Sequence, residues 1–145
     1  MQHRSLFPVI ITPALAAARD FYVQYLGFHA VFDSDWHVQL RATRADGGVP
    51  LELAFMSPDL VSQPFPLRSA FNGQGMLVTI EVNDVDALYQ KLRAAGYEML
   101  LELQDEPWGQ RHFLLRDPSG TLLDVVKQIP PSSEYVIAYA DHIKE

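Results

Sequence analysis

Apolar and polar residues alternate with two different periods along this chain, and the periods follow the same order twice. In the first half the pattern predicts one strand, one helix and three more strands. Their expected ranges are 6–11, 14–26, 28–33, 36–43 and 49–56. The helix has apolar residues three and four positions apart, whereas the strands alternate with a period of two. Pro8 cannot donate to a strand ladder, so the first strand is expected at a sheet edge.

The second half repeats this order after a turn-rich connector at 57–74, which contains three Pro and three Ser and ends with Asn72-Gly73-Gln74. A strand is expected first, then a helix capped by Asn83 or Asp84, and then three strands. The expected ranges are 75–82 for the first strand, a helix end at Ala95, and 97–103, 111–116 and 121–128 for the later strands.

Two matches between the halves favour an internal duplication. Each helix ends at a glycine that precedes an aromatic residue, Gly27-Phe28 and Gly96-Tyr97, and the offset is 96 − 27 = 69 residues. Leu51-Glu52-Leu53 matches Leu123-Asp124-Val125 at an offset of 123 − 51 = 72. Because both matches occur in the same order at similar offsets, we predict a duplicated βαβββ-like unit of the α+β class.

The predicted organisation is a single domain over residues 1–145, with a small-molecule cavity between the two copies. Module one covers about 5–56 and module two about 75–128, joined by the connector at 57–74. The tail, 129–145, contains a possible helix at 134–143 that Ser132 or Ser133 would cap.

Composition narrows the function classes. Apolar residues make up 48% of the chain and charged residues 20%, and no apolar run approaches the roughly 20 residues of a membrane span. The net charge is −7 and no basic stripe occurs, so neither nucleic acid nor a membrane is an expected partner. The chain contains no cysteine, which removes disulfides and thiolate chemistry. The absence of a recognisable signal peptide makes a cytoplasmic location the expectation.

Four segments together resemble the vicinal oxygen chelate superfamily, which includes glyoxalase I, bleomycin-resistance proteins and extradiol dioxygenases. They are Phe21-Tyr22…Leu26-Gly27-Phe28, Glu52 between two leucines, Trp108-Gly109, and the run from Phe113 to Asp117-Pro118-Ser119-Gly120. The resemblance covers about residues 5–128. It implies two βαβββ modules whose eight strands form a U-shaped sheet around a cavity, and it implies a homodimer.

The resemblance also implies four metal-ligand positions, one on the first and one on the last strand of each module. In this chain they fall at Phe7, Glu52, Leu77 (or Met76, if the register slips by one) and Asp124. Only two of the four carry a ligand atom, whereas a catalytic zinc takes about three protein ligands. We therefore expect no family-type metal and no cofactor. If a divalent metal such as Mg²⁺ binds, Glu52 and Asp124 would hold it with waters.

The alternation of the last strands directs Glu52 and Asp124 toward the expected cavity, away from the apolar faces that pack on helices. One interpretation is that nearby Arg, His or backbone groups partner both acids. The other is that they recognise a cationic or hydrogen-bond-donating ligand, or that Glu52 acts as a general base.

Two tryptophans and two histidines complete the candidates. Trp36 and Trp108 occupy comparable places in the modules and are either stacking walls for a planar ligand or ordinary packing. His37 and His112 are expected to be structural or exposed.

The leading hypothesis is a small-molecule-binding protein of the bleomycin-resistance type that sequesters an aromatic or cationic compound without a catalytic metal. Its expected ligand-binding residues are Phe7, Trp36, Glu52, Leu77, Trp108 and Asp124. One alternative is a glyoxalase-like lyase or isomerase that uses Glu52 or Asp124 with an atypical divalent metal. Another is a structural or regulatory dimer whose cavity is filled by side chains.

Overall fold

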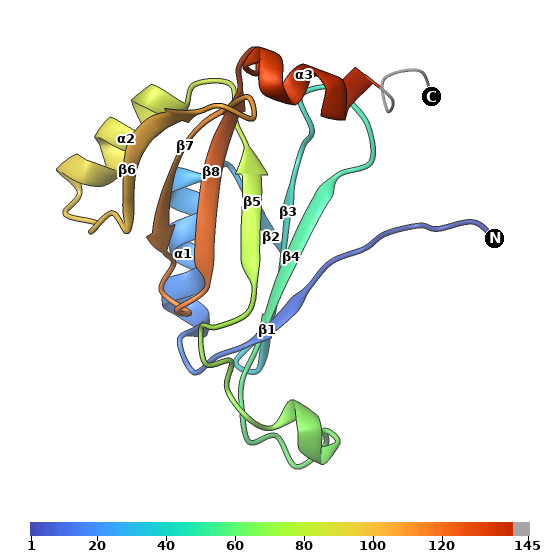
Figure 1. The fold of residues 1–145 in the computed structure, drawn as a ribbon. Coiled ribbons are helices and arrows are strands. Elements are labelled where there is room, and N and C mark those ends of the chain that lie inside the picture. Colours follow the sequence, from blue (N-terminus) through green and yellow to red (C-terminus); the bar gives the residue numbers. More distant parts are fainter. Residues whose placement is uncertain (141–145) are drawn as a thin grey trace. The chain divides into compact units, whose positions relative to one another are not determined.

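The computed structural model describes residues 1–140 (Figure 1). The chain forms two compact units, residues 1–74 with 117–121, and residues 75–116 with the chain from Leu122 onward. The first unit contains β1 (Val9–Ile11), α1 (Leu15–Tyr25), β2 (His29–Asp33), β3 (His37–Ala42), β4 (Leu51–Met56) and the 3₁₀ helix η1 (Phe65–Leu67). The second contains β5 (Leu77–Glu81), α2 (Val85–Ala94), β6 (Leu101–Glu106), β7 (Gln110–Arg116), β8 (Leu122–Gln128) and α3 (Ser133–Ala140).

Each unit contains a four-stranded mixed sheet. In the first unit the strand order is β1-β4-β3-β2, with β1 parallel to β4 and the other pairs antiparallel. In the second unit the order is β5-β8-β7-β6, with the same pattern of directions. The two predicted βαβββ modules are therefore confirmed. β1 lies at a sheet edge, as Pro8 required.

One face of each sheet is covered by its own helix. In the first unit Leu53 and Phe55 of β4 are 3% and 0% exposed, and α1 contacts β2, β3 and β4. In the second unit Leu123 and Val125 of β8 are fully buried, and α2 contacts β7 and β8. The opposite faces therefore contain Glu52 and Asp124, because successive side chains on a strand point to opposite sides.

Both helix stops behave as the sequence predicts. Gly27 and Gly96 have φ angles of +71° and +92°, a region that side chains with a Cβ rarely adopt. Asp84 caps α2, since its Oδ1 accepts a hydrogen bond from the backbone N–H of Ala87 at 3.0 Å.

The strand expected at 97–103 is displaced toward the C-terminus and runs from Leu101 to Glu106. Tyr97 belongs to the helix exit, where its N–H donates to the carbonyl of Leu92 at 3.1 Å. The polar run at 104–106 pairs with β7 instead, because a tight turn at Trp108 brings the two strands together. The tail helix begins at Ser133, and its expected end at Ile143 lies outside the described residues.

The two most specific sequence motifs meet in a buried hydrogen bond. Tyr22 of α1 donates its hydroxyl to Oδ2 of Asp117 at 2.5 Å, and these residues are 0% and 4% exposed. The other carboxylate oxygen of Asp117 accepts from the backbone N–H groups of Ser119 and Thr121. This places the Asp-Pro-Ser-Gly turn in the first unit, although the strands it joins belong to the second.

Candidate functional site

The sheet face of the first unit that α1 does not cover contains Glu52 beside an arginine. Arg41 lies directly opposite Glu52 in the β3–β4 register. Its Nη2 and Nε donate to Oε1 of Glu52 at 3.0 and 3.2 Å. The Glu52 side chain is only 11% exposed. Its negative charge is therefore offset within the chain, so Glu52 matches the interpretation in which nearby groups partner the acids.

The equivalent face of the second unit contains Asp124 beside a histidine. Nδ1 of His112 lies 2.7 Å from Oδ1 of Asp124, and the two side chains are 7% and 8% exposed. On the other side of the ring, Nε2 lies 3.3 Å from Oε1 of Glu106. The imidazole ring therefore lies between two carboxylates, one on each ring nitrogen.

His112 and Glu106 are the residues that the sequence analysis did not assign to this cluster. Asp124 faces Leu114 in the β7–β8 register, and His112 is the next residue of β7 on the same side of the sheet. The alternation of apolar and polar residues in β7 and β8 indicates that His112 and Asp124 lie on the same face of the sheet. Only the register between the two strands shows that the two side chains are neighbours.

The predicted first-strand positions bring no ligand atom to either acid. Phe7 precedes β1, whose Val9 pairs with Ala54, two residues beyond Glu52. In the second unit Leu77 pairs with Leu122, and Asp124 pairs with Thr79. Within residues 1–140, no group of three or more His, Cys, Asp or Glu side chains is arranged to hold a metal ion.

An aromatic cluster lies at the end of the β2–β3 hairpin. The rings of Phe32, Trp36 and His37 stand with centroids 5.4 to 6.3 Å apart. Phe32 and Trp36 keep 49% and 41% of their surface exposed. Because the exposed rings lie together, they form a contiguous aromatic surface, which is the kind of surface that marks binding sites. The sequence indicated Trp36 but not Phe32.

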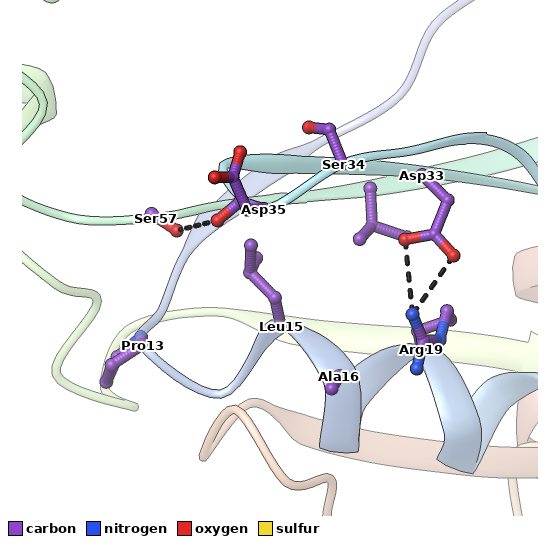
Figure 2. Close-up of a pocket in the computed structure, with 9 residues that line it drawn as sticks. Pro13, Leu15, Ala16, Arg19, Asp33, Ser34, Asp35 and Ser57 are labelled. Carbon is purple, nitrogen blue, oxygen red and sulfur yellow. Dashed lines mark hydrogen bonds and ion pairs between the residues drawn. The ribbon is translucent and has the colours of Figure 1, made fainter.

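Two open pockets adjoin this hairpin. One, of about 410 Å³, is lined by Asp35, Trp36, Leu60 and Ser62. The other, of about 370 Å³, lies between the hairpin and the first turns of α1. Figure 2 shows Leu15 rising from α1 toward the hairpin and Arg19 reaching Asp33. Asp35 lines both pockets.

The charges around the second pocket are largely paired. Arg19 Nε donates to Asp20 at 2.9 Å, and Nη1 donates to both carboxylate oxygens of Asp33. These hydrogen bonds, from Asp20 first and then the charge of Asp33, raise the pKa of the Arg19 guanidinium above its ordinary value. Arg19 therefore stays charged and holds Asp33 against the helix.

Trp108 lies in the turn between β6 and β7 and is packed by its own unit. Its Nε1 donates to Oε1 of Gln110 at 2.9 Å, and its ring stands edge-on to His112, with centroids 6.1 Å apart. Tyr135 of α3 contacts the same indole, and the hydroxyl of Tyr139 donates to the Trp108 carbonyl at 2.7 Å. These contacts match the interpretation in which Trp108 packs against its own unit and does not form a wall for a planar ligand.

Comparison with known protein families shows which family this chain belongs to. The model of the Glyoxalase/Bleomycin resistance protein/Dioxygenase superfamily matches residues 5–125. The chain belongs to this superfamily. An uncharacterised protein from Mycobacterium bovis is 28% identical over 121 residues, which cover 80% of this chain and 78% of that protein. An uncharacterised protein from Mycobacterium tuberculosis is also 28% identical over 121 residues, which cover 80% of this chain and 69% of that protein.

Solved structures from the superfamily share the fold. A glyoxalase/bleomycin resistance protein/dioxygenase from Nocardioides superimposes with a TM-score of 0.66 at 20% identity, covering 89% of this chain and 87% of that one. A lactoylglutathione lyase from Agrobacterium tumefaciens gives 0.65 at 21% identity, covering 85% and 92%. At these identities the likeness concerns the fold alone. No helix within residues 1–140 is long and apolar enough to cross a membrane.

Proposed function

We propose that this superfamily member binds a planar aromatic compound, cationic or neutral, and sequesters it without chemical change. The observation that supports this most directly is the exposed aromatic cluster of Phe32, Trp36 and His37 beside a pocket of about 410 Å³. Ligand pockets in proteins combine aromatic and apolar walls with a few polar groups. This pocket has an indole, a leucine, a serine hydroxyl and a carboxylate.

The pairing of the two sheet-face acids favours binding over the metal-dependent alternative. Glu52 is held by Arg41, and Asp124 is held by His112. A divalent metal at Glu52 would have to displace Arg41, because a guanidinium has no lone pair with which to bind a metal. The lyase or isomerase hypothesis therefore requires a rearrangement that the binding hypothesis does not.

Fluorescence titration tests the proposal. In a Trp108→Phe background Trp36 is the only tryptophan, so a ligand that stacks on it should change its emission. Ethidium, a planar cation, and phenanthridine, its uncharged parent ring, are suitable probes. We expect saturable binding of both. Isothermal titration calorimetry, which needs no indole, should show a loss of about tenfold in affinity in Trp36→Ala, since such a ring contact is worth about 1–2 kcal/mol.

Phe65→Ala is the matched control for Trp36→Ala. Phe65 is an aromatic residue of the same unit that is 81% exposed and lines neither pocket. Its substitution should leave the affinity for both probes unchanged. Failure of ethidium and phenanthridine to bind the unsubstituted chain, by fluorescence and by thermal shift, would contradict the proposed function.

Elemental analysis distinguishes the binding proposal from the hypothesis of a metal-dependent lyase or isomerase. The purified protein is incubated with Ni²⁺, Zn²⁺, Mn²⁺ or Fe²⁺ and then desalted. We expect less than stoichiometric metal. Stoichiometric metal that disappears in the Glu52→Gln, Asp124→Asn variant would overturn the binding-only proposal in favour of the metal-dependent enzyme.

A further inference from the structure

We infer that Asp35, and neither Glu52 nor Asp124, supplies the negative charge that selects a cationic aromatic ligand at the Trp36 pocket. This inference rests on the proposed function and names a residue that the sequence pattern did not single out. It follows from a comparison of the partners of the Asp35 carboxylate with those of Asp33, which lines the adjoining pocket, and of the two sheet-face acids.

Asp33, Glu52 and Asp124 each have a basic side chain bonded to them inside their own unit. Asp33 is bonded by Arg19, with Nη1 3.0 Å from Oδ2. Glu52 is bonded by Arg41 and Asp124 by His112. A ligand cation that approaches any of these carboxylates would compete with the basic side chain already bonded to it. The net attraction between the cation and the carboxylate is therefore weaker.

The Asp35 carboxylate is different. Among the residues that the structure describes, no side chain and no backbone group bonds it, whereas its backbone carbonyl accepts from the hydroxyl of Ser57 at 3.3 Å. Figure 2 shows the carboxylate directed away from α1, with the Ser57 bond on the backbone oxygen. Asp35 also precedes Trp36 in the chain and lines the same pocket.

The backbone that presents Asp35 and Trp36 is fixed by hydrogen bonds. Oγ of Ser34 accepts from the N–H groups of Trp36 and His37 at 3.3 and 3.0 Å. The N–H of Ser57 donates to the Trp36 carbonyl at 2.8 Å. Because the turn is held on both sides, the indole and the carboxylate are presented together before a ligand arrives, which lowers the entropic cost of binding.

The geometry therefore defines a ligand class. The ligand has a planar ring system that stacks on Trp36 and a positive charge at the ring edge that reaches Asp35. The adjoining pocket, which Asp35 also lines, combines the buried side chains of Leu15 and Val38 with polar ones such as Arg19, Ser34 and Ser57. It therefore offers room for a short substituent that has both apolar and polar groups.

The test compares ethidium with phenanthridine, its neutral counterpart. In Asp35→Asn the affinity for ethidium should fall about threefold to fivefold, the size expected for one exposed charge pair, while the affinity for phenanthridine stays the same. Raising NaCl from about 50 mM to about 500 mM should weaken ethidium binding to the unsubstituted chain and leave Asp35→Asn nearly unaffected.

Asp46→Asn is the matched control, because Asp46 is an exposed acid on the β3–β4 turn that is paired with Arg44 and lines neither pocket. It removes the same charge from the chain, and ethidium binding should not change. Asp35→Lys provides a second readout: it should weaken ethidium further and strengthen binding of the aromatic anion 1-naphthalenesulfonate.

Each outcome is decisive. Undiminished ethidium binding in Asp35→Asn, or a larger loss in Glu52→Gln than in Asp35→Asn, overturns the charge assignment while the proposed function stands. An equal loss for ethidium and phenanthridine also overturns it, since a neutral ring does not sense the carboxylate. Failure of both probes on the unsubstituted chain overturns the proposed function itself.

Discussion

Removing the hydroxyl of Tyr22 tests the buried contact between the two family motifs. Tyr22→Phe keeps the ring and its contacts with Phe28 and Phe55, whose centroids lie 5.6 and 5.7 Å away, but deletes the 2.5 Å hydrogen bond to Asp117. A hydrogen bond to a charged group contributes about 1.5–3 kcal/mol, and burial prevents water from replacing the lost donor. We therefore expect the free energy of unfolding to fall by about 2 kcal/mol.

Urea denaturation at pH 7, followed by circular dichroism, measures this change. The slope m should stay constant while the midpoint falls, and the melting temperature should drop by about 6 °C. Tyr89→Phe is the matched control, because Tyr89 donates to Glu102 in an exposed position. That variant should lose much less stability. A loss below about 0.5 kcal/mol in Tyr22→Phe would refute the reasoning, since a buried charge-assisted bond is worth more.

The difference in stability between the wild type and Tyr22→Phe should also depend on pH. Burial, followed by the charge of Asp117, raises the pKa of Tyr22 far above its usual range. The contribution of a group with a raised folded pKa is fully present below the unfolded pKa, about 10 for tyrosine, and is lost as the pH rises beyond it. The stability difference between wild type and Tyr22→Phe should therefore be constant from about pH 7 to 9 and shrink above about pH 10, by about 1.4 kcal/mol per pH unit. A difference that grows with pH would contradict this.

Two further predictions concern the second unit. Gly109→Ala should lower the melting temperature markedly, because φ is +102° and a Cβ would lie 2.9 Å from the Ile129 carbonyl, whereas Gly47→Ala meets no atom within 4 Å and should suffer only from its φ of +73°. Equal losses in the two variants, by differential scanning calorimetry, would argue against the close contact. His112→Gln and Asp124→Asn should each cost about 3 kcal/mol, and the double variant much less than the sum, because the second substitution removes the charge that the first leaves buried. Additive losses would show that the two side chains do not interact.

The local elements could be predicted from the sequence because their signals are local. The glycine stops at Gly27 and Gly96, the cap at Asp84 and the alternation of the strands each depend on a few neighbouring residues, and all appear as expected. The boundary of β6 was displaced because Tyr97 satisfies its backbone at the helix exit, and because register with β7, set by a distant turn, defines where the strand starts.

The partners of the candidate acids were decided by tertiary structure. The sequence placed Glu52 and Asp124 on the sheet faces opposite the helices and left open whether they were partnered, because the period of a strand fixes a face but not the cross-strand register. Folding brought Arg41 to Glu52 and His112 to Asp124. It also left the Asp35 carboxylate without a hydrogen-bond partner among the described residues, next to the exposed indole of Trp36. A charge is available to a ligand only where folding has not already paired it, and that pairing depends on residues distant in the chain.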